Sequence, residues 1–256
     1  MGEPQCGRPT QDMPAWAIDA LGSLKATVES SEPRFPCLYG ARALRTGTLR
    51  YAIVPGTDDA GLDHLASVLR AYVDYAREQA GVSSLLAVFP PDSEQLALED
   101  YRSRFWNVLQ RLHERDSSPW PSHIPRDPQT QPWEFCFAGE AIFVFAACPA
   151  YVRRRSRNTR TFTIAFQPRH MFDRLFEKPV QLERARELIR RRALDFDDVS
   201  GHPDMGLYYE PDNREWRQYV VPDTNEPLQG TCPFRVTNRP DRADAEHPPI
   251  AAAQRA

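Results

Sequence analysis

Three apolar runs in the middle of the chain constrain its fold most, and they cover residues 134–138, 141–147 and 161–166. Short apolar runs bounded by turn residues predict strands buried within a sheet. The first two runs meet at Gly139-Glu140, which predicts a hairpin, and an arginine cluster at 153–157 precedes the third. In one interpretation these strands are a buried hairpin beside a solvated basic loop. In the other, aromatic residues such as Trp133 and Phe137 form one wall of a pocket for a flat anionic ligand.

The segments on either side of these runs predict a mixture of helices and further strands. Helices are expected at 13–32, 41–45, 62–79, 96–114, 169–176 and 182–193, and strands at 48–54, 84–89 and 215–221. The order of these elements predicts an α+β fold, with a mixed β-sheet and helices packed mainly on one side. We expect a flexible N-terminus over residues 1–12, a single domain over 13–236 and a disordered C-terminal tail over 237–256.

The composition argues against several classes of protein. The 256 residues carry a net charge of −3, which argues against general binding to nucleic acid or to anionic membranes. No long apolar run predicts a membrane span, and no signal peptide is expected. The five cysteines lack C-x-x-C spacing, so they favour neither a disulfide framework nor a zinc site and suit a reducing cytoplasm. The apolar helix faces leave a homodimer open.

The common catalytic motifs are missing from the sequence. It has no G-x-S-x-G elbow, no phosphate-binding glycine loop, no G-x-G-x-x-G and no Glu-x-x-His pair for a helical di-iron site. Its six histidines show no His-x-His or His-x-x-x-His spacing. A site that needs a single protein ligand, as haem does, therefore remains open.

Cys37 is the candidate ligand that the local sequence favours most. It follows Pro36 and precedes a short helical segment, and a thiol at a helix N-terminus is expected to have a lowered pKa. Gly40 would let a porphyrin approach closely, whereas the alternative is that Cys37 is a buried small hydrophobic residue. His113, on an aromatic-rich helix, and His202, in a His-Pro loop, are the other candidate ligands. Their alternatives are a helix C-terminal cation and a turn residue.

Charged residues near the apolar runs could hold a cofactor and a substrate. Arg154, Arg155 and Arg157 could bind carboxylates, such as haem propionates, in a bidentate manner; otherwise they form a solvated basic turn. Glu134 and Glu140 could hold a cationic substrate, although a glutamate at a turn is often simply exposed.

Several short segments, in order along the chain, resemble the YqcI/YcgG family. They are Phe35-Pro36-Cys37, Leu112-His113-Glu114 with Asp116, Pro119-Trp120-Pro121, residues 133–140 (WEFCFAGE), Arg155-Ser156-Arg157, Phe166-Gln167-Pro168-Arg169, His202-Pro203-Asp204 and residues 213–219 (NREWRQY). They span most of the chain between about residue 35 and residue 234.

The resemblance implies a function. Some members of the family are similar to haem-dependent N-hydroxylases of guanidines in natural-product and antibiotic biosynthesis, D-cycloserine among the products. It implies haem b (protohaem) as cofactor, O2 and a guanidino substrate as partners, and conversion of L-arginine to N-hydroxy-L-arginine as the reaction. Glu134 or Glu140 would then face the substrate guanidinium, and Arg169 or the arginine cluster would face its carboxylate. The alternative is a non-catalytic haem carrier or sensor.

Overall fold

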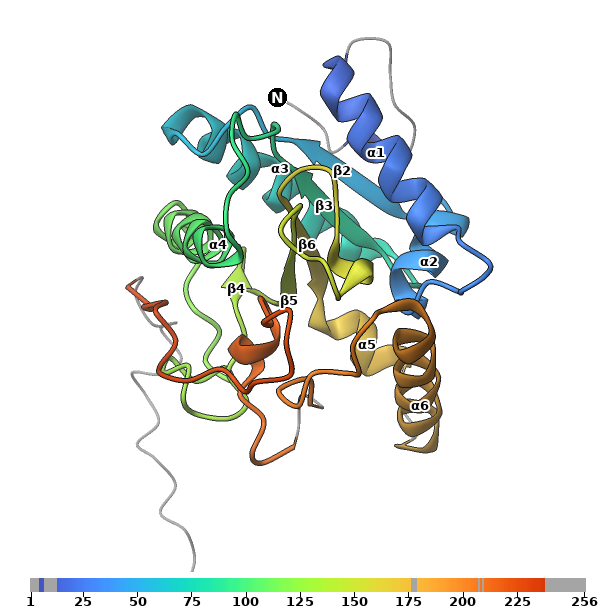
Figure 1. Cartoon of the computed structure of the whole chain (residues 1–256). Coiled ribbons are helices and arrows are strands. Elements are labelled where there is room, and N and C mark those ends of the chain that lie inside the picture. Colours follow the sequence, from blue (N-terminus) through green and yellow to red (C-terminus); the bar gives the residue numbers. More distant parts are fainter. Residues whose placement is uncertain (1–4, 7–12, 176–178, 207, 209, 238–256) are drawn as a thin grey trace, which may run out of the picture.

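The structure is a computed structural model that describes residues 5–6, 13–175, 179–206, 208 and 210–237 (Figure 1). Its elements are β1 (Gln5–Cys6), α1 (Ala15–Val28), α2 (Leu38–Arg45), β2 (Leu49–Ile53), α3 (Asp59–Glu78), β3 (Ser84–Val88), α4 (Leu98–Glu114), β4 (Cys136–Phe137), β5 (Glu140–Ala147), β6 (Thr163–Pro168), α5 (Arg169–Leu175) and α6 (Pro179–Phe196), with 3-10 helices at Arg155–Arg157 and Glu215–Gln218. The tail expected from residue 238 onward lies outside the described residues.

A six-stranded mixed sheet organises the chain, in the order β1-β2-β3-β6-β5-β4. The β2–β3 pair is parallel and every other pair is antiparallel. The α+β class and the mixed sheet are therefore confirmed. Residues 5–6, within the segment expected to be flexible, form β1 and pair with β2.

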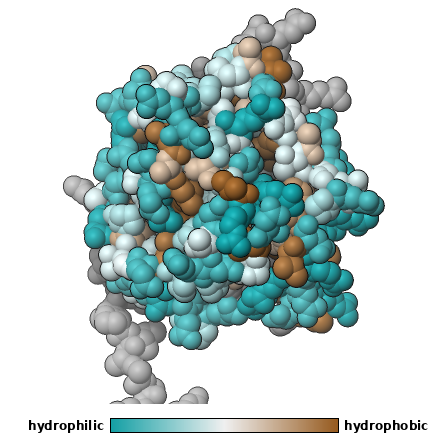
Figure 2. Space-filling model, in the orientation of Figure 1, coloured by the Kyte–Doolittle hydropathy of each residue, from teal (hydrophilic) through white to brown (hydrophobic). Residues whose placement is uncertain are grey.

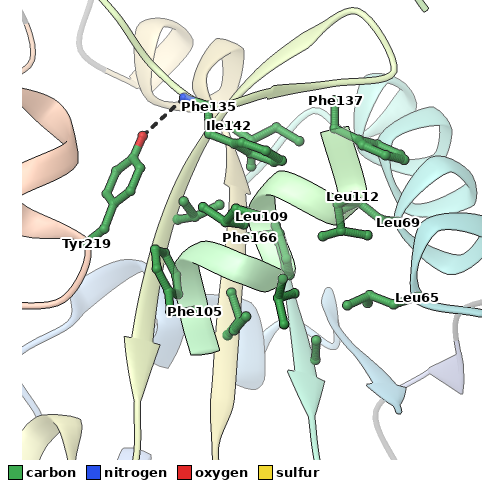
Figure 3. Close-up of a cluster of buried hydrophobic side chains, with 14 of the residues drawn as sticks. Leu65, Leu69, Phe105, Leu109, Leu112, Phe135, Phe137, Ile142, Phe166 and Tyr219 are labelled. Carbon is green, nitrogen blue, oxygen red and sulfur yellow. Dashed lines mark hydrogen bonds between the residues drawn. The ribbon is translucent and has the colours of Figure 1, made fainter. Parts of the chain in front are cut away.

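The larger core lies between one face of the sheet and helices α3 and α4 (Figure 3). Apolar side chains recur at helical spacing on both helices, which is why each buries one face. Leu65, Leu69, Leu109 and Leu112 are all fully buried there. The N–H of Phe135 donates to the hydroxyl of Tyr219 at 3.2 Å, which ties the C-terminal part of the chain to β4 and β5.

Helices α1 and α2 cover β2 and β3 on the opposite face of the sheet. Alternate residues of these strands point to this side, where Tyr51 and Leu86 pack with Leu21 of α1 and Ala43 of α2. Hydrophobic patches reach the surface near the middle of the view in Figure 2, among mostly hydrophilic residues. None of the described helices is both long and apolar enough to cross a membrane.

Two sequence-based expectations about strands are wrong. Residues 215–218 form a 3-10 helix instead of the start of a strand, and the first apolar run pairs as β4 over residues 136–137 alone. The aromatic pattern of the 215–221 segment reflects burial on the larger core, because Trp216 and Tyr219 pack there without a strand partner of their own. Even so, the carbonyl of Tyr219 accepts a hydrogen bond from Ala146 N–H at 2.9 Å, at the edge of β5 beyond β4.

The start of α3 depends on a close backbone approach at Gly61. A Cβ at this position would lie 2.2 Å from the carbonyl oxygen of Gly56, so a side chain must displace backbone. We expect Gly61→Ala to lower the free energy of unfolding by about 1–3 kcal/mol, measured by urea denaturation. Gly22→Ala is the matched control, since nothing lies within 4 Å of its Cβ, and it should stabilise α1 by about 0.5–1 kcal/mol. Equal effects from both variants would contradict this account.

Candidate active site

Cys37 stands at the N-cap of α2, as the sequence predicts. Its Sγ accepts a hydrogen bond from the backbone N–H of Gly40 at 3.3 Å, which partners one of the free donors of the first turn. A Cβ on Gly40 would lie 3.4 Å from this sulfur, so glycine keeps the space beside the thiol open. The side chain of Cys37 is half-buried.

The expected direction of the Cys37 pKa is wrong. Burial raises the pKa of the thiol, and this effect outweighs the N–H groups of Gly40 and Tyr39 and the charge of Arg157, which lower it. In the ligand-free protein Cys37 is therefore a neutral thiol.

Arg157 brings a buried positive charge to the same region. Its guanidinium donates to the carbonyls of Tyr219 and Gln218 at 3.0 Å each and lies 5.2 Å from the ring centre of Phe145. Among the described residues no carboxylate forms an ion pair with it. A buried guanidinium bonded to neutral carbonyls favours an anion nearby, whether a thiolate or the carboxylate of a ligand.

Aromatic side chains from three elements line this side of the sheet. Phe143 and Phe145 alternate along β5 with the buried residues Ile142 and Val144, and their ring centres are 5.9 Å apart. Phe145 packs against the smaller core, whereas Phe143 also touches the larger one. Phe172 of α5 packs edge-on against Tyr39 at 5.1 Å and against Phe143 at 6.4 Å. Sequence analysis missed these four aromatic residues. A strand that is apolar on both faces gives no signal of which face a ligand would meet, and the helical residues Tyr39 and Phe172 are brought to it only by the fold.

Two buried carboxylates share one guanidinium beside the aromatic residues. Arg169 donates through Nε to Glu134 Oε2 at 2.8 Å and through Nη2 to the second oxygen of Glu134, and Nη2 also reaches Glu215 Oε1 at 2.9 Å. The other oxygen of Glu215 accepts amide hydrogens from Asn213 and Gln218, each at 2.8 Å. Glu134 and Glu215 are almost fully buried, so this carboxylate cluster places two carboxyl groups against one guanidinium away from water.

Burial is the main cause of the pKa shifts of the two carboxyl groups in the carboxylate cluster. Burial raises the pKa of Glu134 although the charge of Arg169 opposes it, and burial likewise raises the pKa of Glu215. Burial acts to lower the pKa of Arg169, yet the two carboxylates raise it. The pairing therefore raises the pKa of Arg169. It does not offset the effect of burial on the two carboxyl groups, whose pKa values stay raised, because one cation faces two anions.

A chain of contacts joins the aromatic residues to the carboxylate cluster. The guanidinium of Arg169 lies 3.9 Å from the ring centre of Tyr208 and 5.4 Å from that of Phe172, which in turn contacts Tyr39 near Cys37. On the other side, Gln218 accepts from Arg157 through its backbone and donates to Glu215 through its side chain.

Three of the predicted site residues lie in the larger core, on the other face of the sheet. His113 is fully buried, packs against Trp120 and Phe234, and accepts a hydrogen bond at Nε2 from Thr237 N–H at 2.9 Å. Burial lowers the pKa of His113. Trp133 and Phe137 belong to the same core.

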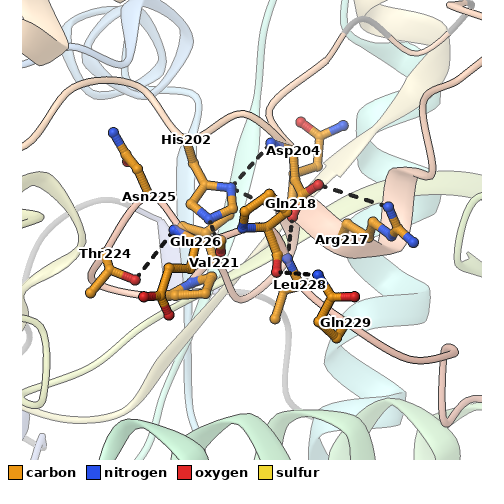
Figure 4. A network of polar contacts seen from close by, with 12 residues as sticks. His202, Asp204, Arg217, Gln218, Val221, Thr224, Asn225, Glu226, Leu228 and Gln229 are labelled. Atoms are coloured by element: carbon orange, nitrogen blue, oxygen red, sulfur yellow. Dashed lines mark hydrogen bonds and ion pairs between the residues drawn. The ribbon is translucent and has the colours of Figure 1, made fainter.

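His202, Arg154 and Arg155 hold loops together. The Nε2–H of His202 donates to the carbonyl of Glu226 at 3.0 Å, and its Nδ1 accepts from Asp204 N–H at 3.1 Å (Figure 4). Both ring nitrogens therefore have backbone partners, and burial lowers the pKa of His202. The side chain of Arg154 donates to carbonyls between residues 200 and 224, and Arg155 donates to the carbonyl of Phe196.

Glu140 lies at the turn between β4 and β5, apart from Cys37. His170 Nδ1 is 2.7 Å from one of its oxygens, and Arg77 Nε is 3.6 Å from the other. Of the predicted residues, the structure thus brings together Cys37, Arg157 and, through Arg169, Glu134. Within the described ranges no group of three or more His, Cys, Asp or Glu side chains could hold a metal ion.

Comparison with known proteins supports the resemblance seen in the sequence. The model of the YqcI/YcgG family matches residues 24–235. The uncharacterised protein YqcI of Bacillus subtilis (strain 168) is 35% identical over 229 residues, which are 88% of this chain and 89% of that protein. The uncharacterised protein YcgG of the same organism is 36% identical over 228 residues, 88% of this chain and 90% of that protein.

A third relative carries a functional description. It is described as a putative N(omega)-hydroxy-L-arginine synthase, DcsA, of Streptomyces lavendulae, and is 31% identical over 229 residues, 87% of this chain and 85% of that protein. No solved structure matches the chain significantly. The family match covers most of the chain, and each of the three relatives aligns over 85% or more of its own length. The chain therefore belongs to the YqcI/YcgG family.

Proposed function

We propose that this chain is an O2-dependent enzyme that N-hydroxylates the guanidine group of L-arginine or a related guanidino amino acid, using haem held by Cys37. The description of the relative DcsA supports the substrate and the reaction. The observation that carries the cofactor is Cys37 itself: a half-buried thiol, at a helix N-cap, beside a buried guanidinium and aromatic rings. The two candidate histidines instead lie in backbone hydrogen bonds.

The residues around Cys37 fit haem chemically. Cys37 would supply the axial sulfur, Arg157 would face an anionic group, and the rings of Phe143, Phe145 and Phe172 offer flat apolar surface. When bound, haem with a thiolate ligand supplies O2 activation and favours O–O cleavage. The positive charge of Arg157 also lowers the thiol pKa, which favours the ligating thiolate form.

The reaction fixes what else the protein must provide. One oxygen atom of O2 enters the guanidine N–H bond to give N–OH, the other leaves as water, and two electrons and two protons come from outside the substrate. The two carboxyl groups of Glu134 and Glu215 share one guanidinium, and this arrangement favours a cationic guanidine at that end of the site. The charge of Arg157 favours the carboxylate of the substrate or of a haem propionate at the other end.

The test is an optical titration of the full chain purified with haem supplied. We expect a Soret band that shifts on addition of L-arginine. The same concentration of L-citrulline, whose ureido group is neutral, should not shift it. Under a reducing system with O2, mass spectrometry should detect N-hydroxy-L-arginine. A Soret band without an arginine response or product would instead assign the chain to haem carriage or sensing. The absence of any Soret band would overturn the haem proposal.

A further inference from the structure

A groove of about 970 Å³ lies on the outer side of α2, between α1 and α6. Its wall includes Ala41 and Leu44 of α2 and Phe35 from the segment before that helix, and Arg192 of α6 closes one side. The aromatic ring of Phe35 packs edge-on against Phe196 at 5.6 Å, which holds this wall in place.

The groove is lined with positive charge. Four cationic side chains line it, Lys25, Arg34, Arg45 and Arg192, against one carboxylate, Glu29. Glu29 already faces Lys25 at 3.9 Å. Among the described residues, no carboxylate lies within ion-pair distance of the three arginines, although arginines elsewhere on the chain have such partners. On a chain of net charge −3 this is a local excess of cations, and it favours an anionic partner.

The groove and the proposed haem ligand share the helix α2. Ala41 and Leu44 stand one and two turns along the helix that Cys37 caps, and Phe35 is two residues before Cys37. A partner seated there would contact the helix whose N-cap is Cys37.

We propose that the basic groove is the docking surface for an acidic one-electron carrier protein, of the iron–sulfur or flavin class. This inference rests on the proposed function, whose reaction takes two electrons from outside the chain. Each electron would pass from the reduced carrier to the haem beside Cys37, oxidising the carrier by one electron at each docking. The three arginines, which have no carboxylate partner among the described residues, would steer an acidic surface into the groove and fix its orientation.

The test measures binding directly, so that it does not depend on catalysis. The full chain, with and without haem, is titrated with two acidic probes, a plant-type [2Fe–2S] ferredoxin and a flavodoxin, at low and at high salt. We expect at least one probe to bind, and to bind more weakly at high salt, because salt screens charges beyond about 10 Å at 0.1 M. Arg45→Glu with Arg192→Glu should weaken binding about tenfold or more.

Matched variants separate the groove from a general charge effect. Arg42→Glu with Arg191→Glu changes net charge by the same amount, on the same two helices, at exposed positions that do not line the groove. This control should weaken binding much less. Equal loss in both double variants, or no binding of either probe, would overturn the docking surface. A change in oligomeric state by light scattering would assign the groove to a second copy of the chain instead. Carrier binding without haem or turnover would keep the surface while removing the proposed function.

Discussion

Replacing Arg169 with methionine is expected to lower the free energy of unfolding by about 3–5 kcal/mol. The change removes the one cation that faces Glu134 and Glu215 among the described residues, and leaves both buried carboxylates without a charged partner in that part of the chain. Methionine keeps an unbranched stem between Tyr208 and Phe172, so the loss reports mainly on the ion pairs. Urea denaturation followed by tryptophan fluorescence measures it.

The loss should depend on pH in a definite direction. Burial already raises the pKa of Glu134 above its ordinary value of 4.5, and removing Arg169 raises it further. Below pH 4.5 the carboxyl is protonated in both the folded and the unfolded chain, so the deficit of the variant is smallest there. Between pH 4.5 and about 7, the pKa of Glu134 in the unmodified folded chain, both folded chains retain the proton and the deficit stays constant. Above about pH 7 the unmodified chain releases this proton while the folded variant retains it, so the deficit grows until the pH passes the folded pKa of the variant.

Two further variants show whether the carboxylates cause the effect. Arg115→Met also removes an arginine that pairs with two aspartates, but Asp59 and Asp63 are largely exposed, and its cost should stay below about 1 kcal/mol. Adding Glu134→Gln to Arg169→Met should recover part of the loss and flatten its pH dependence. A loss in Arg169→Met that is the same at every pH would show that packing, and not charge, is responsible.

Local sequence pattern was sufficient for most of the fold. The helices over 62–79 and 96–114 were predicted within a few residues of α3 and α4, since their apolar stripes are long and regular. The strands predicted at 48–54 and 84–89 match β2 and β3, the first because its residues alternate and the second because it is a short apolar run. The strand expected at 215–221 failed because aromatic residues buried on a core resemble a strand when their pairing is unknown.

The sequence predicts only those features of the candidate site that depend on neighbouring residues in the chain. Cys37 could be placed at a helix N-cap from its immediate neighbours, but the sign of its pKa shift depends on burial by distant segments. The carboxylate cluster of Glu134, Arg169 and Glu215 is built from three separate parts of the chain, and no regular spacing in the sequence connects these residues. The arginine cluster shows the same limit, since Arg154 binds loops while Arg157, three residues later, faces Phe145.

Replacing Cys37 with serine should remove thiolate ligation while leaving the fold intact. Serine is a preferred N-cap residue, so its hydroxyl can accept the Gly40 N–H that Sγ now accepts, and the helix should be at least as stable. Without the sulfur, the ferrous–CO spectrum of the haem-loaded chain should lose its red-shifted thiolate position. Production of N-hydroxy-L-arginine should fall on the order of 100-fold or more, because the ligand that favours O–O cleavage is gone.

Cys148→Ser is the matched control for Cys37→Ser. Cys148 is also buried, and its thiol also has backbone N–H partners, at Ala150 and Tyr151, but it belongs to the larger core. This variant should keep the thiolate spectrum and most of the activity. Cys37→Ala should lose the spectrum as serine does and, in addition, cost about 1 kcal/mol of stability through the lost cap. A thiolate spectrum that persists in Cys37→Ser would exclude Cys37 as the ligand. A histidine-type spectrum in the unmodified chain would instead indicate His113 or His202. Each of these histidines would first have to give up a backbone hydrogen bond.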